Sequence, residues 1–232
     1  MKSQSLKSNL SPVFKLSDIK ANDLKDNEIL DSAQKKKVKT WKSMSNVTSI
    51  FNSIPLAKRK ILVLDLDETL IHTSDIPPHP RVQTIKCGNP PVTVFKRPGV
   101  DSFIQLCTAY FDTYVYTYGT IIYADPILDI LCPMIRQDHR LYRHRCQYQK
   151  GHVVKDLNRF NRSLNEVILI EDSTDAKKQH PENTILIPSW MGTPTDSILI
   201  DYLPPILLKL AGANDVRPII QSLNPKDCIK MQ

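Results

Sequence analysis

Two aspartates, Asp65 and Asp67, directly follow the apolar run Ile61–Leu64. Such a run is typical of a strand buried on both faces of a parallel sheet, and open α/β sheets bind ligands at the carboxyl ends of their strands. The spacing lets both side chains face the same crevice. One carboxylate can attack phosphorus, while the other protonates the leaving oxygen and later activates water. About one D-x-D is expected by chance in such a chain, so the location after a buried strand carries the prediction of phosphoryl transfer.

A phosphoryl-transfer site also needs positive charge, because two anions must meet. Magnesium binds one or two carboxylates together with waters and phosphate oxygens. Glu171 and Asp172 follow a second buried strand, Thr117 follows a third, and Lys155 adds a cation. Taken singly, each has an ordinary structural interpretation: Thr117 as a helix cap, Lys155 as a surface lysine, and the acidic pair as the start of a loop. Together they favour a magnesium-dependent site.

Strands alternate with helices along residues 60–222, which predicts an α/β fold with a central, mainly parallel sheet. The expected strands are Ile61–Leu64, Thr113–Tyr116, Val167–Ile170 and Ile185–Pro188, and the expected helices are Val100–Ala109, Tyr123–Leu131 and Ile198–Ala211, the last with Pro204-Pro205 near its middle. Val153–Phe160 is expected to form a short helix or turn. The Pro-rich insertion Thr73–Phe95 predicts a hairpin-like flap over the mouth of the site.

The chain has 232 residues, 41% of them hydrophobic and 24% charged, which suits one globular domain with tails. We expect a basic, largely disordered tail at 1–59, a phosphatase domain at 60–222 and a C-terminal tail at 223–232. Residues 1–60 carry thirteen Lys or Arg against five Asp or Glu, a balance of +8, whereas the rest carries eighteen against nineteen. Because the excess positive charge lies in the tail, direct nucleic-acid binding is not expected.

Several features bear on the compartment. No apolar run approaches the length of a membrane span, and the start leads into no secretory signal. The five cysteines are odd in number and form no C-x-x-C pair, which favours reduced thiols. The basic cluster Gln34–Lys39 fits either nuclear import or a solvated charge run. We therefore expect a nuclear or cytoplasmic protein, with a mitochondrial presequence as the least favoured interpretation because the first seventeen residues lack Arg.

The segment Asp65-Leu66-Asp67-Glu68-Thr69-Leu70 resembles the D-x-D-x-T signature of the haloacid dehalogenase superfamily. Its form is similar to phosphatases of the RNA polymerase II carboxy-terminal-domain type, including the small phosphatases and the nuclear-envelope phosphatase acting on lipin. The resemblance covers about residues 60–222 and continues, in the family's order, through Lys96-Arg97-Pro98-Gly99-Val100-Asp101, Tyr123-Ala124-Asp125-Pro126, Val154-Lys155-Asp156-Leu157, His180-Pro181-Glu182-Asn183, Ser189-Trp190 and Tyr202-Leu203-Pro204.

This resemblance implies a three-layer haloacid dehalogenase-like fold with a small β-hairpin insertion and no large cap. It also implies a phosphoserine/phosphothreonine protein phosphatase that uses Mg²⁺ and an aspartyl-phosphate intermediate. The implied partner is a phosphoprotein substrate, and the basic tail is a candidate contact for an adaptor that recruits the enzyme. By resemblance, the site residues are Asp65 as nucleophile; Asp67 as general acid and base; Thr69, Thr117, Lys155 and Arg143 around the phosphate; Asp65, the Asp67 carbonyl and Asp172 on the metal; and Glu171 behind the metal ligands.

Two positions depart from the family pattern. Glu171-Asp172-Ser173-Thr174 stands where Asp-Asn-Ser-Pro is usual, so a carboxylate replaces an amide metal ligand. This exchange predicts retained metal binding with altered affinity. Thr117-Tyr118-Gly119 stands where Thr-Ala-Ser is usual, which predicts a bulkier wall beside the phosphate.

A binding protein on the same fold is the main alternative function. Asp215-Val216-Arg217-Pro218-Ile219-Ile220 resembles the tail of the receptor subunit of the mitochondrial inner-membrane translocase. Both aspartates of the D-x-D pair are present here, and no membrane-spanning run precedes the domain, so we favour the enzyme. A catalytically weak scaffold is the third alternative. Hydrolysis of a generic aryl phosphate separates the enzyme from both.

Overall fold

A computed structural model describes residues 59–77, 79–149, 151–224, 227–228 and 231. The predicted basic tail at 1–59 lies outside the described residues except for Arg59. Among the described helices, none is both long enough and apolar enough to cross a membrane.

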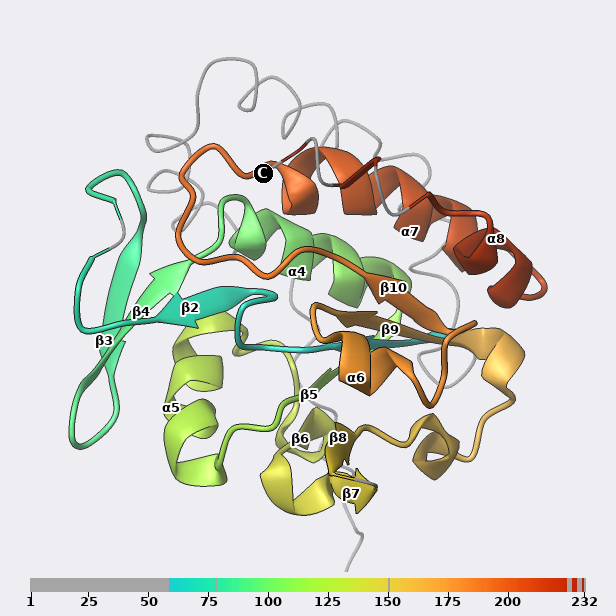
Figure 1. The fold of residues 1–232 in the computed structure, drawn as a ribbon, viewed down its shortest axis with the longest axis horizontal. Coiled ribbons are helices and arrows are strands. Elements are labelled where there is room, and N and C mark those ends of the chain that lie inside the picture. Colours follow the sequence, from blue (N-terminus) through green and yellow to red (C-terminus); the bar gives the residue numbers. More distant parts are fainter. Residues whose placement is uncertain (1–58, 78, 150, 225–226, 229–230, 232) are drawn as a thin grey trace, which may run out of the picture.

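The centre of the fold is a sheet of five strands in the order β10-β9-β1-β5-β6, all parallel to their neighbours (Figure 1). The strands are β1 Ile61–Leu64, β5 Asp112–Tyr116, β6 Arg140–Leu141, β9 Val167–Glu171 and β10 Thr184–Leu186. The predicted α/β class with a parallel central sheet is therefore confirmed. β1 lies in the middle, with β9 on one side and β5 on the other.

Both faces of β1 are buried, as its unbroken apolar sequence predicts. Leu62 and Leu64 point into the larger hydrophobic cluster, which also contains the buried faces of α4 Val100–Tyr110 and α7 Leu203–Ala211. Ile61 and Val63 point into a second cluster. Packing on both faces holds β1 in place within the sheet and so fixes the position of its carboxyl end.

The remaining helical elements cover the sheet and its edges (Figure 1). They are α5 Ile121–Leu131, α6 Thr174–Lys177 and α8 Arg217–Gln221, together with the 3-10 turns Gln137–His139, Arg143–Arg145, Leu157–Phe160 and Leu164–Glu166 and the π-helical turn Ile198–Tyr202. In Figure 1, α4 and α7 lie above the sheet and α6 lies below it, in agreement with the three layers that the family resemblance implies.

The insertion forms a three-stranded antiparallel sheet with the order β2-β4-β3. Its strands are β2 Ile71–Thr73, β3 Thr84–Cys87 and β4 Val92–Lys96. The predicted hairpin is β3–β4, and β2 extends it. Since β2 begins directly after the D-x-D-x-T loop, the flap is joined to the site by its first strand. A separate two-stranded sheet is formed by β7 Gln147–Gln149 and β8 His152–Val154.

Two local predictions need correction. Val153–Phe160 begins in strand β8 and only then forms a 3-10 turn. Strand β8 forms because β7 pairs with it, and no periodic pattern in the sequence indicates this pairing. The closing helix is interrupted: Ile198–Tyr202 is π-helical, and Pro204-Pro205 lie at the start of α7 rather than in its middle. Proline is favoured there because the first turn of a helix needs no amide donors.

The C-terminal segment contacts the domain at the residues that are described. Cys228 is 2% exposed within the larger hydrophobic cluster, and the Met231 carbonyl accepts a hydrogen bond from the Ser197 amide at 2.8 Å. The Asp215–Ile220 motif also packs on the domain, since the Val216 amide donates to the Asn165 carbonyl at 3.1 Å.

Candidate active site

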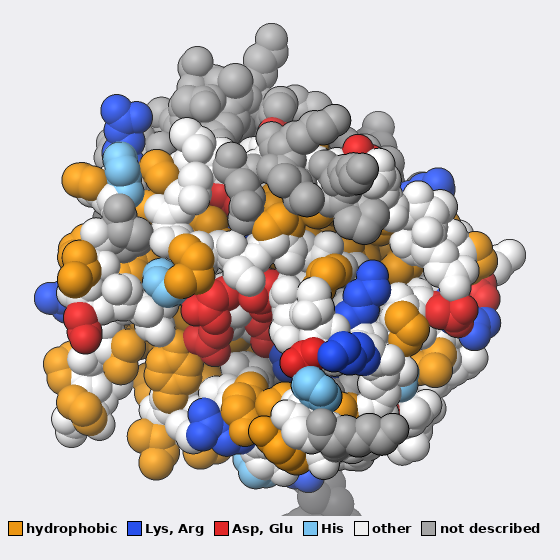
Figure 2. Space-filling model, viewed as in Figure 1, with side chains coloured by type: hydrophobic (Ala, Val, Ile, Leu, Met, Phe, Trp, Pro, Cys, Tyr) orange, Lys and Arg blue, Asp and Glu red, His pale blue; other side chains and the backbone are white. Residues whose placement is uncertain are grey.

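The carboxyl ends of β9, β1 and β5 meet at one edge of the sheet. Asp65 follows β1, Thr117 follows β5, and Asp172 follows β9. Because the three strands are parallel neighbours, these residues converge although they lie about fifty residues apart in sequence. Figure 2 shows acidic side chains gathered near the middle of this face, with hydrophobic side chains beside them.

The loop that carries the aspartates is tightly closed. The Asp65 amide donates to the Ile170 carbonyl at 3.0 Å, and the Leu70 amide donates to the Leu66 carbonyl at 2.8 Å. Glu68 adopts a left-handed conformation with φ 58°, and its carbonyl accepts the Trp190 amide at 2.7 Å. The loop is thus tied to β9 at its start and to the segment after β10 at its tip.

Arg97 is hydrogen-bonded to the same loop. Its Nε and one terminal nitrogen bind both oxygens of Asp196 at 2.9 and 2.8 Å, and both side chains are completely buried. The other terminal nitrogen donates to the Thr69 carbonyl at 3.0 Å. A bidentate pair of this kind adds geometric rigidity as well as energy. Arg97 therefore joins the loop that carries Asp65 and Asp67 to the segment that contains Asp196.

Lys155 lies between two buried carboxylates. Its Nζ donates to Glu171 at 2.7 Å and to Asp65 Oδ1, and all three side chains are buried. Burial and the neighbouring Glu171 raise the pKa of Asp65 well above its usual range, against the opposing effect of Lys155. Burial lowers the pKa of Lys155, but the two carboxylates outweigh it and raise the pKa overall. The lysine is therefore charged.

Asp65, Glu171 and Asp172 form the acidic cluster at this edge. Their carboxylate oxygens lie within 4.8 Å of one another. Both oxygens of Glu171 are engaged, one with Lys155 and the other with the Ser173 amide at 3.1 Å. Oxygen donors at this spacing suit a hard divalent cation such as Mg²⁺. Among the described residues, this cluster of three carboxylates is the candidate cation site.

Two hydroxyls orient Asp172. Ser189 donates to its Oδ2 at 2.6 Å, and Thr69 donates to its Oδ1 at 3.3 Å. Thr69 is completely buried. Hydrogen bonds of this type fix the rotamer of a carboxylate and leave its remaining lone pairs directed at a common point.

Asp67 is held from two sides. Thr117 Oγ1 lies 3.2 Å from its Oδ2, and the Tyr123 hydroxyl donates to its Oδ1 at 2.5 Å. The same hydroxyl lies 3.3 Å from Thr73 Oγ1, at the end of β2. Burial and the charge of Asp67 raise the pKa of Tyr123, so the phenol remains a donor. Gly119 permits this approach, since a Cβ there would lie 2.9 Å from the Tyr123 ring.

Arg143 lies at the rim, in a 3-10 turn after β6. Its Nε donates to the Tyr118 carbonyl at 2.7 Å, and its guanidinium carbon lies 4.6 Å from the centroid of the Tyr118 ring. Both side chains are exposed.

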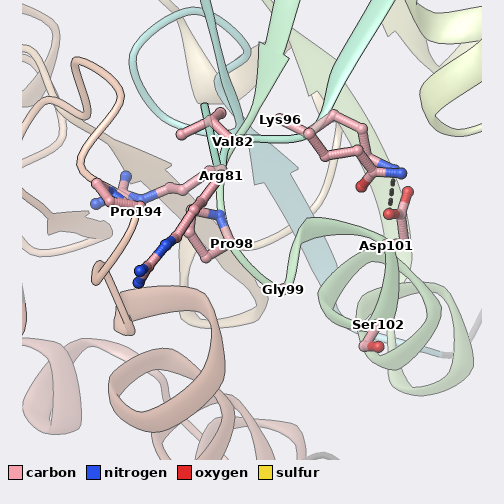
Figure 3. Close-up of a pocket in the computed structure, with 10 residues that line it drawn as sticks. Arg81, Val82, Lys96, Pro98, Gly99, Asp101, Ser102 and Pro194 are labelled. Carbon is pink, nitrogen blue, oxygen red and sulfur yellow. Dashed lines mark hydrogen bonds and ion pairs between the residues drawn. The ribbon is translucent and has the colours of Figure 1, made fainter. Parts of the chain in front are cut away.

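A separate small cavity lies between the flap and the start of α4 (Figure 3). It is lined in part by Arg81, Lys96, Arg97 and Ser102, and its volume is about 30 Å³. Lys96 is paired with Asp101 across it. A space of this size holds one or two waters, so it is too small for a phosphorylated side chain.

Comparison with known proteins places this chain in a family. The family model described as NLI interacting factor-like phosphatase matches residues 60–217. The chain belongs to this family. A probable C-terminal domain small phosphatase of Dictyostelium discoideum is 40% identical over 165 residues, covering 69% of this chain and 54% of the relative. CTD nuclear envelope phosphatase 1 of Xenopus tropicalis is 34% identical, covering 73% of this chain and 74% of the relative.

The chain spans about half the length of the small-phosphatase relatives from Dictyostelium discoideum and Homo sapiens. Among solved structures, the fission yeast RNA polymerase II CTD phosphatase Fcp1 in its beryllium fluoride complex aligns with a TM-score of 0.45. That alignment has 21% identity and covers 66% of this chain and 45% of the other.

Within this NLI interacting factor-like phosphatase domain, most residues singled out from the sequence lie together. Five of them are linked through the contacts described above: Asp65, Thr69, Lys155, Glu171 and Asp172. Asp67 and Thr117 contact each other and follow the neighbouring strands β1 and β5. Arg143 is connected only through Tyr118 and Gly119 among the described residues.

Sequence reasoning missed Tyr123, Ser189 and Arg97 as parts of this site. Each belongs to a motif that the family resemblance includes, but nothing in the spacing indicates which atom each side chain reaches. A tyrosine in the first turn of a helix and an arginine beside a proline have ordinary structural roles, so their residue types alone give no signal.

Proposed function

We propose that this protein is a magnesium-dependent phosphoserine/phosphothreonine protein phosphatase that acts through an aspartyl-phosphate on Asp65. The observation that carries the proposal is the arrangement of Asp65, Lys155 and Glu171 at the end of the central strand, with Asp67 held separately by Thr117 and Tyr123. The contact of Asp65 with Lys155 supports a role as nucleophile, and the separate position of Asp67 supports a role in proton transfer.

The first step uses both aspartates. A carboxylate oxygen of Asp65 attacks phosphorus, the ester P–O bond breaks, and Asp67 gives its proton to the departing serine or threonine oxygen. In this step the hydroxyls of Thr69 and Thr117, which contact Asp172 and Asp67 in the structure, turn to donate their protons to phosphoryl oxygens. The buried Lys155 side chain neutralises negative charge in the site.

The second step regenerates the enzyme. Asp67, now a carboxylate, takes a proton from a water that attacks phosphorus, and the acyl phosphate bond to Asp65 breaks to give inorganic phosphate. The hydrogen bond between Tyr123 and Asp67 keeps the Asp67 carboxyl group in one orientation through both steps.

A divalent cation completes the charge balance. Asp65 and Asp172 would hold Mg²⁺ together with the backbone carbonyl of Asp67, and Glu171 would remain bound to Lys155 behind them. When bound, the ion supplies charge stabilisation between the carboxylates and the phosphoryl group. Asp172 replaces the amide usual in the family, so the ligand set carries one more negative charge.

The substrate we propose is a phosphoprotein. The relatives include proteins named as CTD small phosphatases and CTD nuclear envelope phosphatases. Over the described residues, the insertion contributes only the flap of β2, β3 and β4, so no large cap domain encloses the site. A nuclear or cytoplasmic location, and an adaptor that recruits the enzyme through residues 1–59, are part of the same proposal.

Hydrolysis of an aryl phosphate and of phosphoserine peptides, with and without Mg²⁺, tests this function. Activity that is lost in excess chelator, restored by Mg²⁺ and abolished by Asp65→Asn supports the proposal. A folded protein without activity under these conditions would instead favour a translocase-receptor-like binding role or a scaffold.

A further inference from the structure

Lys155 lies just before a short turn whose first amide needs a partner from outside the turn. Strand β8 ends at Val154, and the 3-10 turn Leu157–Phe160 follows two residues after Lys155. The first amides of a helical turn have no acceptor within the turn itself. His180 supplies one, because its Nε2 accepts a hydrogen bond from the Leu157 amide at 3.0 Å. Leu157 is 0% exposed and His180 is 7% exposed, so this bond is shielded from water.

The position of His180 is set by β10. Its carbonyl accepts hydrogen bonds from the Asn183 amide at 3.1 Å and from the Thr184 hydroxyl at 2.8 Å. Thr184 begins β10, which pairs with β9, and β9 ends at Glu171. Glu171 in turn accepts a hydrogen bond from Lys155 Nζ at 2.7 Å. The backbone after Lys155 is thus fastened to the same two strands that carry a carboxylate partner of its ammonium group.

We propose that His180 is a positioning residue for Lys155: by holding the Leu157 amide, it fixes the backbone that places the Lys155 ammonium group against Asp65. This inference rests on the proposed phosphatase function and adds a residue that acts through Lys155. A buried amide without an acceptor is unfavourable, so without His180 the backbone shifts until the amide meets water or another acceptor. Such a shift draws Lys155 away from Asp65.

The same ring nitrogen has a second partner. His180 Nε2 lies 3.3 Å from Asp156 Oδ1, which also accepts a hydrogen bond from the Asn158 amide at 3.0 Å. To accept from Leu157, the ring must be neutral with its proton on Nδ1. A protonated ring donates from Nε2 to Asp156 instead, and the Leu157 amide then loses its acceptor.

The protonation of His180 therefore controls the contact with Leu157. Burial lowers the pKa of His180, against the opposing effect of Asp156, which is the charged group that faces the ring among the described residues. The ring is thus neutral at neutral pH, and the positioning contact is present there and lost toward acid pH.

Hydrolysis of an aryl phosphate by the full chain with Mg²⁺ compares two His180 variants. His180→Gln keeps an uncharged acceptor, whereas His180→Leu keeps the bulk and removes the acceptor. Near neutral pH we expect His180→Leu to lower kcat about tenfold, with KM changed less than about twofold, as for the loss of one hydrogen bond that holds a charged group in place. His180→Gln should keep kcat within about twofold of the parent. Urea unfolding gives the folded fraction of each variant, so that kcat is expressed per folded molecule.

The pH profile separates positioning from a purely structural role. Between about pH 7 and pH 5, the kcat of the parent should fall relative to that of His180→Gln, because only the parent has an imidazole at this position that can take up a proton. His152→Gln is the matched control, since His152 pairs with Asp175 at the surface at 2.8 Å. This control should leave the pH profile of the parent unchanged.

The Lys155 ammonium group can also be followed without turnover. In protein with ¹⁵N-labelled lysine, an ammonium group held by two buried carboxylates exchanges slowly with water and gives a sharp NMR signal. Its absence from Lys155→Arg protein assigns the signal. The signal should persist in His180→Gln and broaden or disappear in His180→Leu, and in the parent it should broaden as the pH falls from about 7 to 5.

Three results would overturn the inference. An unchanged kcat in folded His180→Leu would leave His180 with a structural role alone, and so would an unchanged Lys155 signal. A constant ratio between the kcat of the parent and that of His180→Gln over the pH range would show that the ring proton does not control the contact. If His180→Leu does not fold, this ratio and the Lys155 signal of the parent decide the question. Failure of the phosphatase proposal is seen separately, as absence of turnover by parent protein whose Lys155 signal is intact.

Discussion

Replacement of Lys155 by methionine should strongly destabilise the domain. Lys155 is 3% exposed, and it is shared between Asp65 and Glu171, whose side chains are 8% and 2% exposed. Lys155→Met keeps the length of the side chain and leaves two adjacent buried carboxylates without their cation. Breaking a buried pair in this way typically costs about 3–5 kcal/mol. For a domain of this size, such a loss lowers the melting temperature by roughly 6–20 °C.

Urea unfolding in the presence of chelator measures this effect. The matched control is Lys178→Met, because Lys178 pairs with Asp175 at the surface, where the side chains are 62% and 43% exposed. The control should lose about 0–1 kcal/mol. A Lys155→Met variant that is destabilised no more than the control would refute the buried charge cluster.

The stability deficit of Lys155→Met should also depend on pH. The pKa of Asp65 is already raised by burial and by Glu171, and removal of the lysine raises it further. A carboxyl group whose pKa is higher in the folded state binds more protons there than in the unfolded state, so stability increases as the pH falls. The deficit should therefore shrink between pH 7 and pH 5. A deficit that is constant over this range would contradict the assignment of uncompensated carboxylates.

Three further predictions concern other parts of the site and its support. Tyr123→Phe removes the hydrogen bond to Asp67 and should lower kcat for a phosphoserine peptide about tenfold. The decrease should be smaller for an aryl phosphate, whose leaving group needs less acid. An equal decrease in kcat for both substrates would argue against a role of Tyr123 in orienting Asp67. Asp172→Asn removes one negative ligand and should weaken Mg²⁺ binding by about tenfold or more in calorimetric titration, and unchanged affinity would contradict its place on the metal. Burial lowers the pKa of His180, whose Nε2 accepts a hydrogen bond from the Leu157 amide at 3.0 Å. The stability of the domain should therefore fall as the pH drops from about 7 toward 5. In a His180→Gln variant stability should depend less on pH, and an unchanged pH dependence would exclude this histidine as the cause.

The sequence was informative where chemistry follows directly from a buried strand. The apolar run Ile61–Leu64 has to be a central strand, because both its faces need cover, and Asp65 then has to lie at its carboxyl end. The same reasoning placed Thr117 and Asp172 at neighbouring strand ends. Parallel pairing brings these ends together without any information about side-chain contacts.

Other features depend on tertiary contacts that no local pattern encodes. Tyr123 reaches Asp67 only because the first turn of α5 packs against the end of β2, and Gly119 makes room for its ring. Strand β8 exists because β7 pairs with it, although its three residues have no strong pattern of their own. The two prolines of α7 were misplaced because the π-helical turn before them continues the apolar pattern of the helix.

The most direct test of the whole account is the site of phosphorylation in Asp67→Asn protein. This variant keeps the nucleophile and loses the base that activates water, so the phosphorylated enzyme should accumulate with an aryl phosphate substrate. Mass spectrometry after acid quench should find the added phosphate on the peptide that contains Asp65, and Asp65→Asn should show none. Phosphate on a histidine or serine, or normal turnover by Asp65→Asn, would contradict the mechanism.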